Sequence, residues 1–191
     1  MLRIVKEATA EIVVRKSHFI SVISHCNDAD DLKSKKEKLC LEHPGAKHIV
    51  HAAIFSNQSF FSFSDDREPK GTAGLPTLDV LKGTGAVNVA LFTIRYFGGI
   101  LLGTGGLKRA YCDSAKLCVS QAEFAEIKET RRLEFTAGYQ DIGRLKRLFK
   151  DRSAQLLETV EADDVRMLVE VEESCFEQVR SEIENILRKR I

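Results

Sequence analysis

The chain has 191 residues, of which 43% are hydrophobic and 30% are charged, and this composition excludes a mostly disordered protein. The net charge of +1 excludes the strongly basic character of proteins that nucleic acid holds mainly through its phosphates, so any nucleic-acid contact must come from a local patch. The five cysteines are odd in number and never spaced as C-x-x-C, which indicates neither a disulfide framework nor a zinc ribbon.

No segment of the sequence has the pattern of a membrane span or of a secretion signal. The longest apolar stretch, residues 86–94, contains Asn88 and Thr93 and is too short to cross a bilayer. The first seven residues carry charges that break any apolar run, so they do not resemble a signal peptide. We therefore expect a cytoplasmic protein that makes no contact with a membrane.

The first part of the chain alternates between strand-like and helix-like segments. Residues 10–24 hold two apolar stretches split by Arg15-Lys16-Ser17, which predicts a pair of strands or one interrupted strand. A lysine-rich helix is expected over residues 28–42, ending at His43-Pro44-Gly45. The elements expected after it are a strand at 47–55, a buried strand at 87–96 and a helix at 104–122.

After residue 124 the pattern becomes strand, helix, strand, strand, helix. The expected segments are, in chain order, 128–138, 139–149, 154–160, 165–171 and 175–190. This order is a split β-α-β unit, typical of a small α+β sandwich. The fold class is therefore α+β with two domains, residues 1–125 and 126–191, joined near residues 122–126.

The glycine-rich loop before the helix at 104–122 is the best candidate in the sequence for contact with an anion. The loop matches neither a Walker A motif nor a dinucleotide-binding fingerprint. Thr104 is positioned to cap the helix, and Gly105 and Gly106 in the first turn leave backbone N–H groups bare, where the helix dipole favours an anion. Lys108 and Arg109 follow one turn further on.

A purely structural interpretation of the same helix stays open. The glycines would serve tight packing and positive φ, and Arg109 and Lys116 would pair with Asp113 on the helix surface. Glycine motifs alone do not separate the two interpretations.

An acidic segment at residues 64–74 is the second concentration of polar side chains. The carboxylates of Asp65, Asp66 and Glu68 could ligate Mg²⁺, which prefers oxygen ligands. Alternatively they cap turns, as acidic residues do before proline or glycine. Their spacing matches no calcium loop, so we expect turn chemistry and neither a metal nor a cofactor.

No arrangement of residues in the sequence indicates a catalytic nucleophile. All five histidines lie between His18 and His51, and His48 and His51 are three apart on an expected strand, so they would point to opposite faces. No serine or cysteine stands in a nucleophile elbow. We therefore expect no catalytic residues and a protein that is not an enzyme.

Two long motifs resemble the signature of the YigZ/IMPACT family. They are SDDREPKGTAGLP at 64–76 and RYFGGILLGTGGLKRAY at 95–111, and RKSHFI at 15–20 and HPGAKH at 43–48 support them. The resemblance covers nearly the whole chain. We add Arg95 and Lys47, two cations within these motifs, to the candidate anion and nucleic-acid contacts at Thr104, Gly105, Gly106, Lys108 and Arg109.

The resemblance implies a fold and a cellular role. It implies an N-terminal domain similar to domain IV of elongation factor G, and a ferredoxin-like C-terminal domain similar to domain V of that factor. Members of the family resemble translation regulators, and the eukaryotic ones act through a partner of a stress-response kinase. This sequence departs from the family at Arg67, where glycine is usual, which predicts a positive φ there. We also expect the C-terminal sheet to lack the last strand of a ferredoxin-like domain.

Three functions remain after these observations. The preferred one is a non-enzymatic RNA- or ribosome-associated protein that regulates translation, to which a basic stretch around Lys128, Arg131, Arg132, Arg144 and Arg147 could add contacts. The second is a metal-assisted phosphoryl or nucleotide hydrolase that uses Asp65, Asp66 and Glu68. The third is a protein-interaction module, with a protein partner in translation control and no nucleic acid.

Overall fold

The computed structural model describes residues 1–188 and 191, and the chain divides into two compact units, residues 1–127 and 128–191. Both units mix helices and strands, so the α+β class predicted from the sequence is confirmed. In the described residues no helix is both long enough and apolar enough to span a bilayer.

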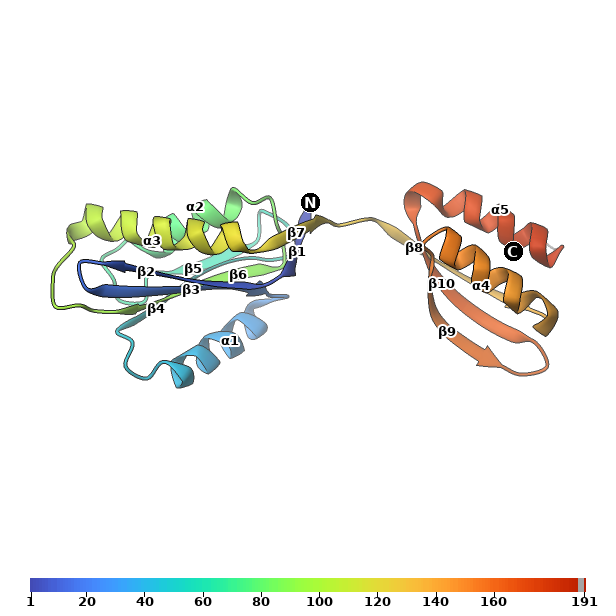
Figure 1. Cartoon of the computed structure of the whole chain (residues 1–191), viewed down its shortest axis with the longest axis horizontal. Coiled ribbons are helices and arrows are strands. Elements are labelled where there is room, and N and C mark those ends of the chain that lie inside the picture. Colours follow the sequence, from blue (N-terminus) through green and yellow to red (C-terminus); the bar gives the residue numbers. More distant parts are fainter. Residues whose placement is uncertain (189–190) are drawn as a thin grey trace. The chain divides into compact units, whose positions relative to one another are not determined.

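The first unit is built on a five-stranded sheet. Its strands run in the order β2-β3-β6-β4-β5, and each neighbouring pair is antiparallel. Helices α2 and α3 cover one face of this sheet and α1 covers the other (Figure 1). The elements are β1 (Leu2–Lys6), β2 (Ala8–Val14), β3 (Ser17–His25), α1 (Ala29–Glu42), β4 (His48–Ile54), β5 (Phe61–Ser64), α2 (Gly74–Lys82), β6 (Val89–Tyr96), α3 (Gly103–Gln121) and β7 (Glu123–Glu126).

Strand β6 is the centre of this unit because helices cover both of its faces. Seven of its eight residues are buried, which explains its nearly continuous apolar sequence. Successive side chains alternate between the two faces: Leu91 packs with the core under α2 and α3, whereas Phe92 and Ile94 pack with the core under α1. Each fully buried side chain of this size contributes about 1.5–3 kcal/mol to folding.

Two short strands of the first unit pair outside the main sheet. Strands β1 and β7 are antiparallel, with Ile4 opposite Phe124. Because β7 pairs in this way, residues 123–126 belong to the first unit, and the division falls after Ile127 rather than after residue 125.

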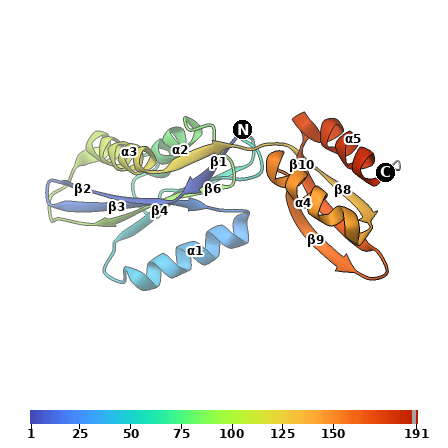
Figure 2. The same ribbon diagram turned by 45° about the vertical axis from the view of Figure 1, so that its right-hand side comes forward.

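The second unit has the predicted order of strand, helix, strand, strand, helix. Its three-stranded sheet has the order β8-β10-β9, so the first and third strands are neighbours, as in a split β-α-β unit. Helices α4 and α5 lie together on one face of the sheet (Figure 2). The described residues contain no strand after α5. The elements are β8 (Thr130–Ala137), a 3₁₀ turn (Tyr139–Asp141), α4 (Ile142–Asp151), β9 (Gln155–Glu161), β10 (Val165–Glu172), a second 3₁₀ turn (Glu173–Cys175) and α5 (Phe176–Leu187).

Candidate functional site

The start of α3 differs in one respect from the sequence prediction. The helix begins at Gly103 and its N-cap is Leu102, which has no side-chain oxygen. Thr104 therefore lies inside the first turn and does not cap the helix, which corrects that prediction. Gly105 and Gly106 do lie in the first turn, as predicted. The N–H groups of this turn have no capping side chain, so the helix start can attract an anion.

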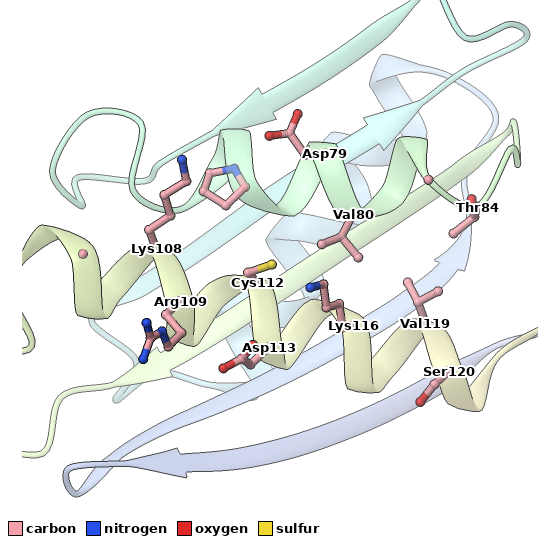
Figure 3. Close-up of a pocket in the computed structure, with 13 residues that line it drawn as sticks. Asp79, Val80, Thr84, Lys108, Arg109, Cys112, Asp113, Lys116, Val119 and Ser120 are labelled. Atoms are coloured by element: carbon pink, nitrogen blue, oxygen red, sulfur yellow. The ribbon is translucent and has the colours of Figure 1, made fainter.

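A groove with a cavity of about 820 Å³ lies between α2 and α3 (Figure 3). Gly105 lines it at the start of α3, and Val80 of α2 faces Val119 of α3 further along. We call this cavity the α2–α3 groove. Three cations of α3 also line it: Lys108, Arg109 and Lys116.

The cations of the α2–α3 groove form no ion pair within the described residues, although the carboxylates of Asp79 and Asp113 also line the groove. In Figure 3, Lys108 reaches from α3 toward α2, whereas Arg109 and Asp113 lie on the other side of α3. Within the described part of the chain, none of the cations Lys108, Arg109 and Lys116 makes an ion pair, and the expected pairing with Asp113 does not form. These positive charges are therefore available to an external anion.

A second cavity, of about 410 Å³, lies against the first turn of α3 and the ends of β4 and β6. Lys47, Arg95 and Thr104 line it. The predicted contact residues thus fall into two groups, because Gly105, Lys108 and Arg109 line the α2–α3 groove instead. Gly106 lines neither cavity. We call the smaller cavity the β6–α3 cavity.

A buried ion pair forms one wall of the β6–α3 cavity. Arg95 Nη1 donates to Glu68 Oε1 at 2.6 Å, and their side chains are 6% and 3% exposed. The Tyr111 hydroxyl donates to the same Glu68 oxygen at 2.8 Å. Burial and the negative charge of Glu68 raise the pKa of Tyr111 far above its usual range. Tyr111 therefore stays a neutral donor, and the cluster joins the turn before α2 to β6 and α3.

The roles of Glu68 and Tyr111 in this cluster were missed at the level of sequence. The sequence pattern suggested only a metal ligand or a turn cap for Glu68, and it indicated no polar role for Tyr111. The sequence did contain a signal of this cluster, because Arg95 lies in a strand whose composition predicts full burial. A buried guanidinium requires a carboxylate partner.

The acidic segment is occupied by turn and capping interactions. The Asp65 carboxylate accepts hydrogen bonds from the backbone N–H groups of Gly71, Ala73 and Gly74, at 2.8, 3.0 and 2.8 Å. It therefore caps the start of α2 from outside the helix, which satisfies donors that no local side chain reaches.

Asp66 is engaged differently, with the start of β4 and with α1. One of its oxygens accepts from the Ile49 N–H at 2.7 Å, and the other from Lys36 Nζ at 3.2 Å. Burial opposes the charged form, but the Ile49 hydrogen bond and the Lys36 charge outweigh it and hold the pKa of Asp66 below its usual range. Asp65, Asp66 and Glu68 thus turn to three different sets of partners. The described residues contain no group of three or more His, Cys, Asp or Glu side chains placed to hold a metal ion.

The two histidines of β4 face opposite sides of the sheet. His48 lines the β6–α3 cavity, where its Nε2 lies 3.8 Å from Glu68 Oε1, while its Nδ1–H donates to the Asp66 carbonyl at 2.8 Å. His51 lies on the α1 side, where its ring is 6.2 Å from that of Phe92. Burial, with the nearby Lys36 charge, lowers the pKa of His51 to about 4.

The basic stretch of the second unit is largely neutralised by its own acidic neighbours. Lys128 pairs with Glu172, and Arg132 with Glu170. The other pairs are those of Arg131 with Glu173 and Glu177, and of Arg144 with Asp141. Arg131 also stacks on Phe176, with its guanidinium carbon 3.7 Å from the ring centroid. Contrary to our expectation, most of this stretch does not offer free positive charge.

Comparison with known proteins relates this geometry to a family. The family model described as Impact N-terminal domain matches residues 15–119. An IMPACT family member of Haemophilus influenzae is 32% identical over 174 residues, which cover 89% of this chain and 84% of that protein. The IMPACT family member YvyE of Bacillus subtilis is 33% identical over 186 residues, covering 95% and 86%. A solved structure titled as a crystal structure of a hypothetical protein matches with a TM-score of 0.69 at 27% identity, covering 98% of this chain and 92% of that one.

Proposed function

The chain belongs to the IMPACT family, and on that premise we propose that it is a non-enzymatic protein that associates with RNA or with the ribosome and regulates translation. The observation that carries the proposal is the set of unpaired cations in the α2–α3 groove. Lys108 and Arg109 are exposed within the first two turns of α3, next to an uncapped helix start. The translational role itself rests on the resemblance to a family of translation regulators.

Free positive charge in this groove favours phosphate contact over a structural role. A surface cation already paired with a carboxylate loses that pair when it binds a phosphate, which offsets part of the gain. Lys108, Arg109 and Lys116 have no such pair to lose in the described structure. Each charge-assisted hydrogen bond to a phosphate is therefore closer to its full value of about 1.5–3 kcal/mol.

The binding free energies indicate that the groove alone binds RNA weakly, or that it acts together with other contacts. A helix start contributes about 0.3–1 kcal/mol toward binding an anion. Micromolar affinity requires about 8 kcal/mol. The groove cations and the helix start must act together, and a target that also offers protein surface, such as a ribosome, would supply the remaining contacts.

The hydrolase alternative is disfavoured by how the carboxylates are used. The Asp65 carboxylate accepts three backbone hydrogen bonds, and Glu68 is buried against Arg95 and Tyr111. Releasing either carboxylate to a metal would uncap α2 or leave the Arg95 charge buried without compensation.

One observation favours the third function, that of a protein-interaction module. The α2–α3 groove is bordered by apolar side chains such as Val80 and Val119. A groove between two helices is a common site for an amphipathic segment of a partner protein. The cations along the rim would then meet acidic side chains rather than phosphates.

Co-sedimentation with purified ribosomes and with ribosome-free RNA tests the proposal. We expect the protein to be retained at low salt and released as salt rises, and the double variant Lys108→Glu with Arg109→Glu to lose retention. The matched control is Lys33→Glu with Lys38→Glu, which changes the net charge equally on α1, on the other face of the sheet. Circular dichroism verifies that both variants fold. Equal, salt-insensitive retention of all three proteins would contradict phosphate contact and support a protein partner.

A further inference from the structure

The β6–α3 cavity combines an apolar wall with several polar groups. Its volume of about 410 Å³ falls in the range of small-molecule sites, about 300–1,000 Å³. The apolar wall consists of Pro69, Phe97, Leu101, Leu102 and Leu107. The polar groups come from Lys47, His48, Glu68, Arg95, Gly103 and Thr104.

The start of α3 gives one end of this cavity a positive potential. The helix has 19 residues and no side-chain cap, and Gly103 and Thr104 of its first turn line the cavity. Glu68 compensates the charge of Arg95, but Lys47 is exposed and makes no side-chain ion pair in the described residues. The balance of charge at this end therefore favours an anion.

Arg95 supplies a second, independent sign of a ligand. Its side chain is 6% exposed and lines the cavity, yet its Nε has no hydrogen-bond partner among the described residues. Nη1 is committed to Glu68, and Nη2 lies 3.5 Å from Ser17 Oγ, a long distance for a hydrogen bond. A buried guanidinium with unmet donors is unusual, and an absent ligand is one of the recognised explanations.

Phe97 gives the cavity a surface for a planar group. Its side chain is 43% exposed, and its ring centroid is 5.5 Å from the Arg95 guanidinium carbon. An exposed aromatic ring beside a cation is the arrangement on which nucleic-acid bases stack, because every base has a π-face.

We propose that the β6–α3 cavity binds a nucleoside 5′-monophosphate, with the phosphate at the start of α3 beside Lys47 and Thr104 and the base against Phe97. The ligand is either a free nucleotide or the 5′-phosphorylated end of an RNA, since both present the same phosphate and base. If the ligand is an RNA end, the inference rests on the proposed association with RNA. If the ligand is a free nucleotide, the inference is independent of that proposal.

Titration of the ¹⁵N-labelled full chain with AMP, adenosine or inorganic phosphate tests the site by NMR. We expect AMP to shift the amide resonances of Gly103 and Thr104 with saturation, and adenosine and phosphate each to bind at least about tenfold more weakly, because each lacks one of the two contacts. Phosphate that binds as tightly as AMP, or AMP that shifts no resonance at the start of α3, would overturn the proposal.

Two exposed positions provide variants that leave the core intact. Lys47→Ala is expected to weaken AMP binding about tenfold or more, as for loss of a charge-assisted contact. Phe97→Ala is expected to remove the preference for AMP over phosphate. Lys33→Ala on α1 and Phe60→Ala are the matched controls, since neither residue lines the cavity. AMP affinities unchanged by both cavity variants would refute the assignment.

Further comparisons separate the two sources of ligand and the two proposals. A 5′-phosphorylated RNA hexamer that binds more tightly than the same hexamer with a 5′-hydroxyl identifies an RNA end, whereas equal binding of the two hexamers beside tight AMP binding identifies the free nucleotide. The variant Lys108→Glu with Arg109→Glu should keep AMP binding, because neither residue lines the cavity. Failure of ribosome retention with intact AMP binding would reject only the proposed function, and the reverse result would reject only this inference.

Discussion

Glu68 Oε1 and Arg95 Nη1 lie 2.6 Å apart in the interior of the first unit. The two residues are 27 positions apart in the sequence, and each stands in one of the two motifs that identify the family. Their pairing therefore joins the two motifs in the fold: one supplies a buried charge and the other compensates it. Tyr111, at the end of the second motif, completes the cluster.

Replacing Glu68 with glutamine should strongly destabilise the protein. Glu68→Gln leaves the Arg95 charge buried without a counter-charge, and loss of one partner of such a pair costs about 3–5 kcal/mol of unfolding free energy. Urea denaturation followed by circular dichroism measures this loss. The surface control Glu11→Gln, whose side chain is 50% exposed, should change stability by about 0.5 kcal/mol or less. A loss for Glu68→Gln no larger than that of the control would disprove the structural role of the pair.

His51 should make stability fall in mildly acidic solution. Its pKa is lowered from 6.5 to about 4, so below pH 6.5 the unfolded chain takes up a proton that the folded protein does not. Its contribution is therefore fully present above the unfolded pKa and is lost as pH falls toward the folded one. Nδ1 of His51 is buried and has no hydrogen-bond partner in the part of the chain that the structure describes, which is consistent with a neutral ring.

The variant His51→Asn isolates this effect from other titrating groups. Between pH 6.5 and pH 4, wild type should lose about 1–3 kcal/mol more stability than the variant. The comparison requires urea denaturation of both proteins across that pH interval. Parallel curves for the two proteins would show that His51 does not titrate as described.

Arg67→Gly should stabilise the protein. The predicted positive φ of Arg67 is confirmed at 70°, a conformation that costs a non-glycine residue about 1–2 kcal/mol. Glycine removes that cost but also removes the hydrogen bond from Arg67 Nη2 to the Lys47 carbonyl, at 3.2 Å on the surface. We expect a net gain of about 0.5–1 kcal/mol, measured as a rise in the midpoint of urea denaturation. A variant less stable than wild type would mean that the hydrogen bond outweighs the strain.

Gly98 in the loop before α3 and Gly105 in the first turn of α3 should respond in opposite ways to alanine. A Cβ at Gly98 would lie 2.0 Å from the Lys16 carbonyl carbon, whereas a Cβ at Gly105 would meet nothing within 4 Å. Gly98→Ala must push the loop away from the β2–β3 turn and should cost about 2 kcal/mol or more. Gly105→Ala should be neutral or should stabilise by up to about 1 kcal/mol, since alanine is the better helix former. Thermal denaturation of the pair decides the point, and equal effects would contradict the close approach at Gly98.

The sequence was sufficient to predict the helices and strands whose own apolar residues follow a clear pattern. Strand β6 could be predicted from its unbroken apolar residues, and the second unit from alternation in β10 and helical spacing in α5. Helix α2 and strand β5 could not, because they are short and depend on distant partners. The start of α2 is capped by Asp65, nine residues before Gly74, and no local pattern reveals such a cap.

The candidate site was predictable in its cations but not in its geometry. Glycines and basic residues identified the start of α3, yet the division into two cavities depends on how α2 and β4 pack around it. Thr104 does not cap the helix because α3 begins one residue earlier, at Gly103. The prediction of free positive charge in the basic stretch of the second unit was wrong for a related reason. The acidic residues that neutralise it, such as Glu172 for Lys128, lie on other elements.

The salt dependence of ribosome binding tests most directly whether Lys108 and Arg109 contact phosphates. Each phosphate contact releases counterions, so the logarithm of the binding constant should fall linearly with the logarithm of salt concentration over about 50–200 mM. Removing both contacts in the double variant Lys108→Glu with Arg109→Glu should reduce the magnitude of that slope by about 1.5. The same slope in the variant and in wild type would contradict the account.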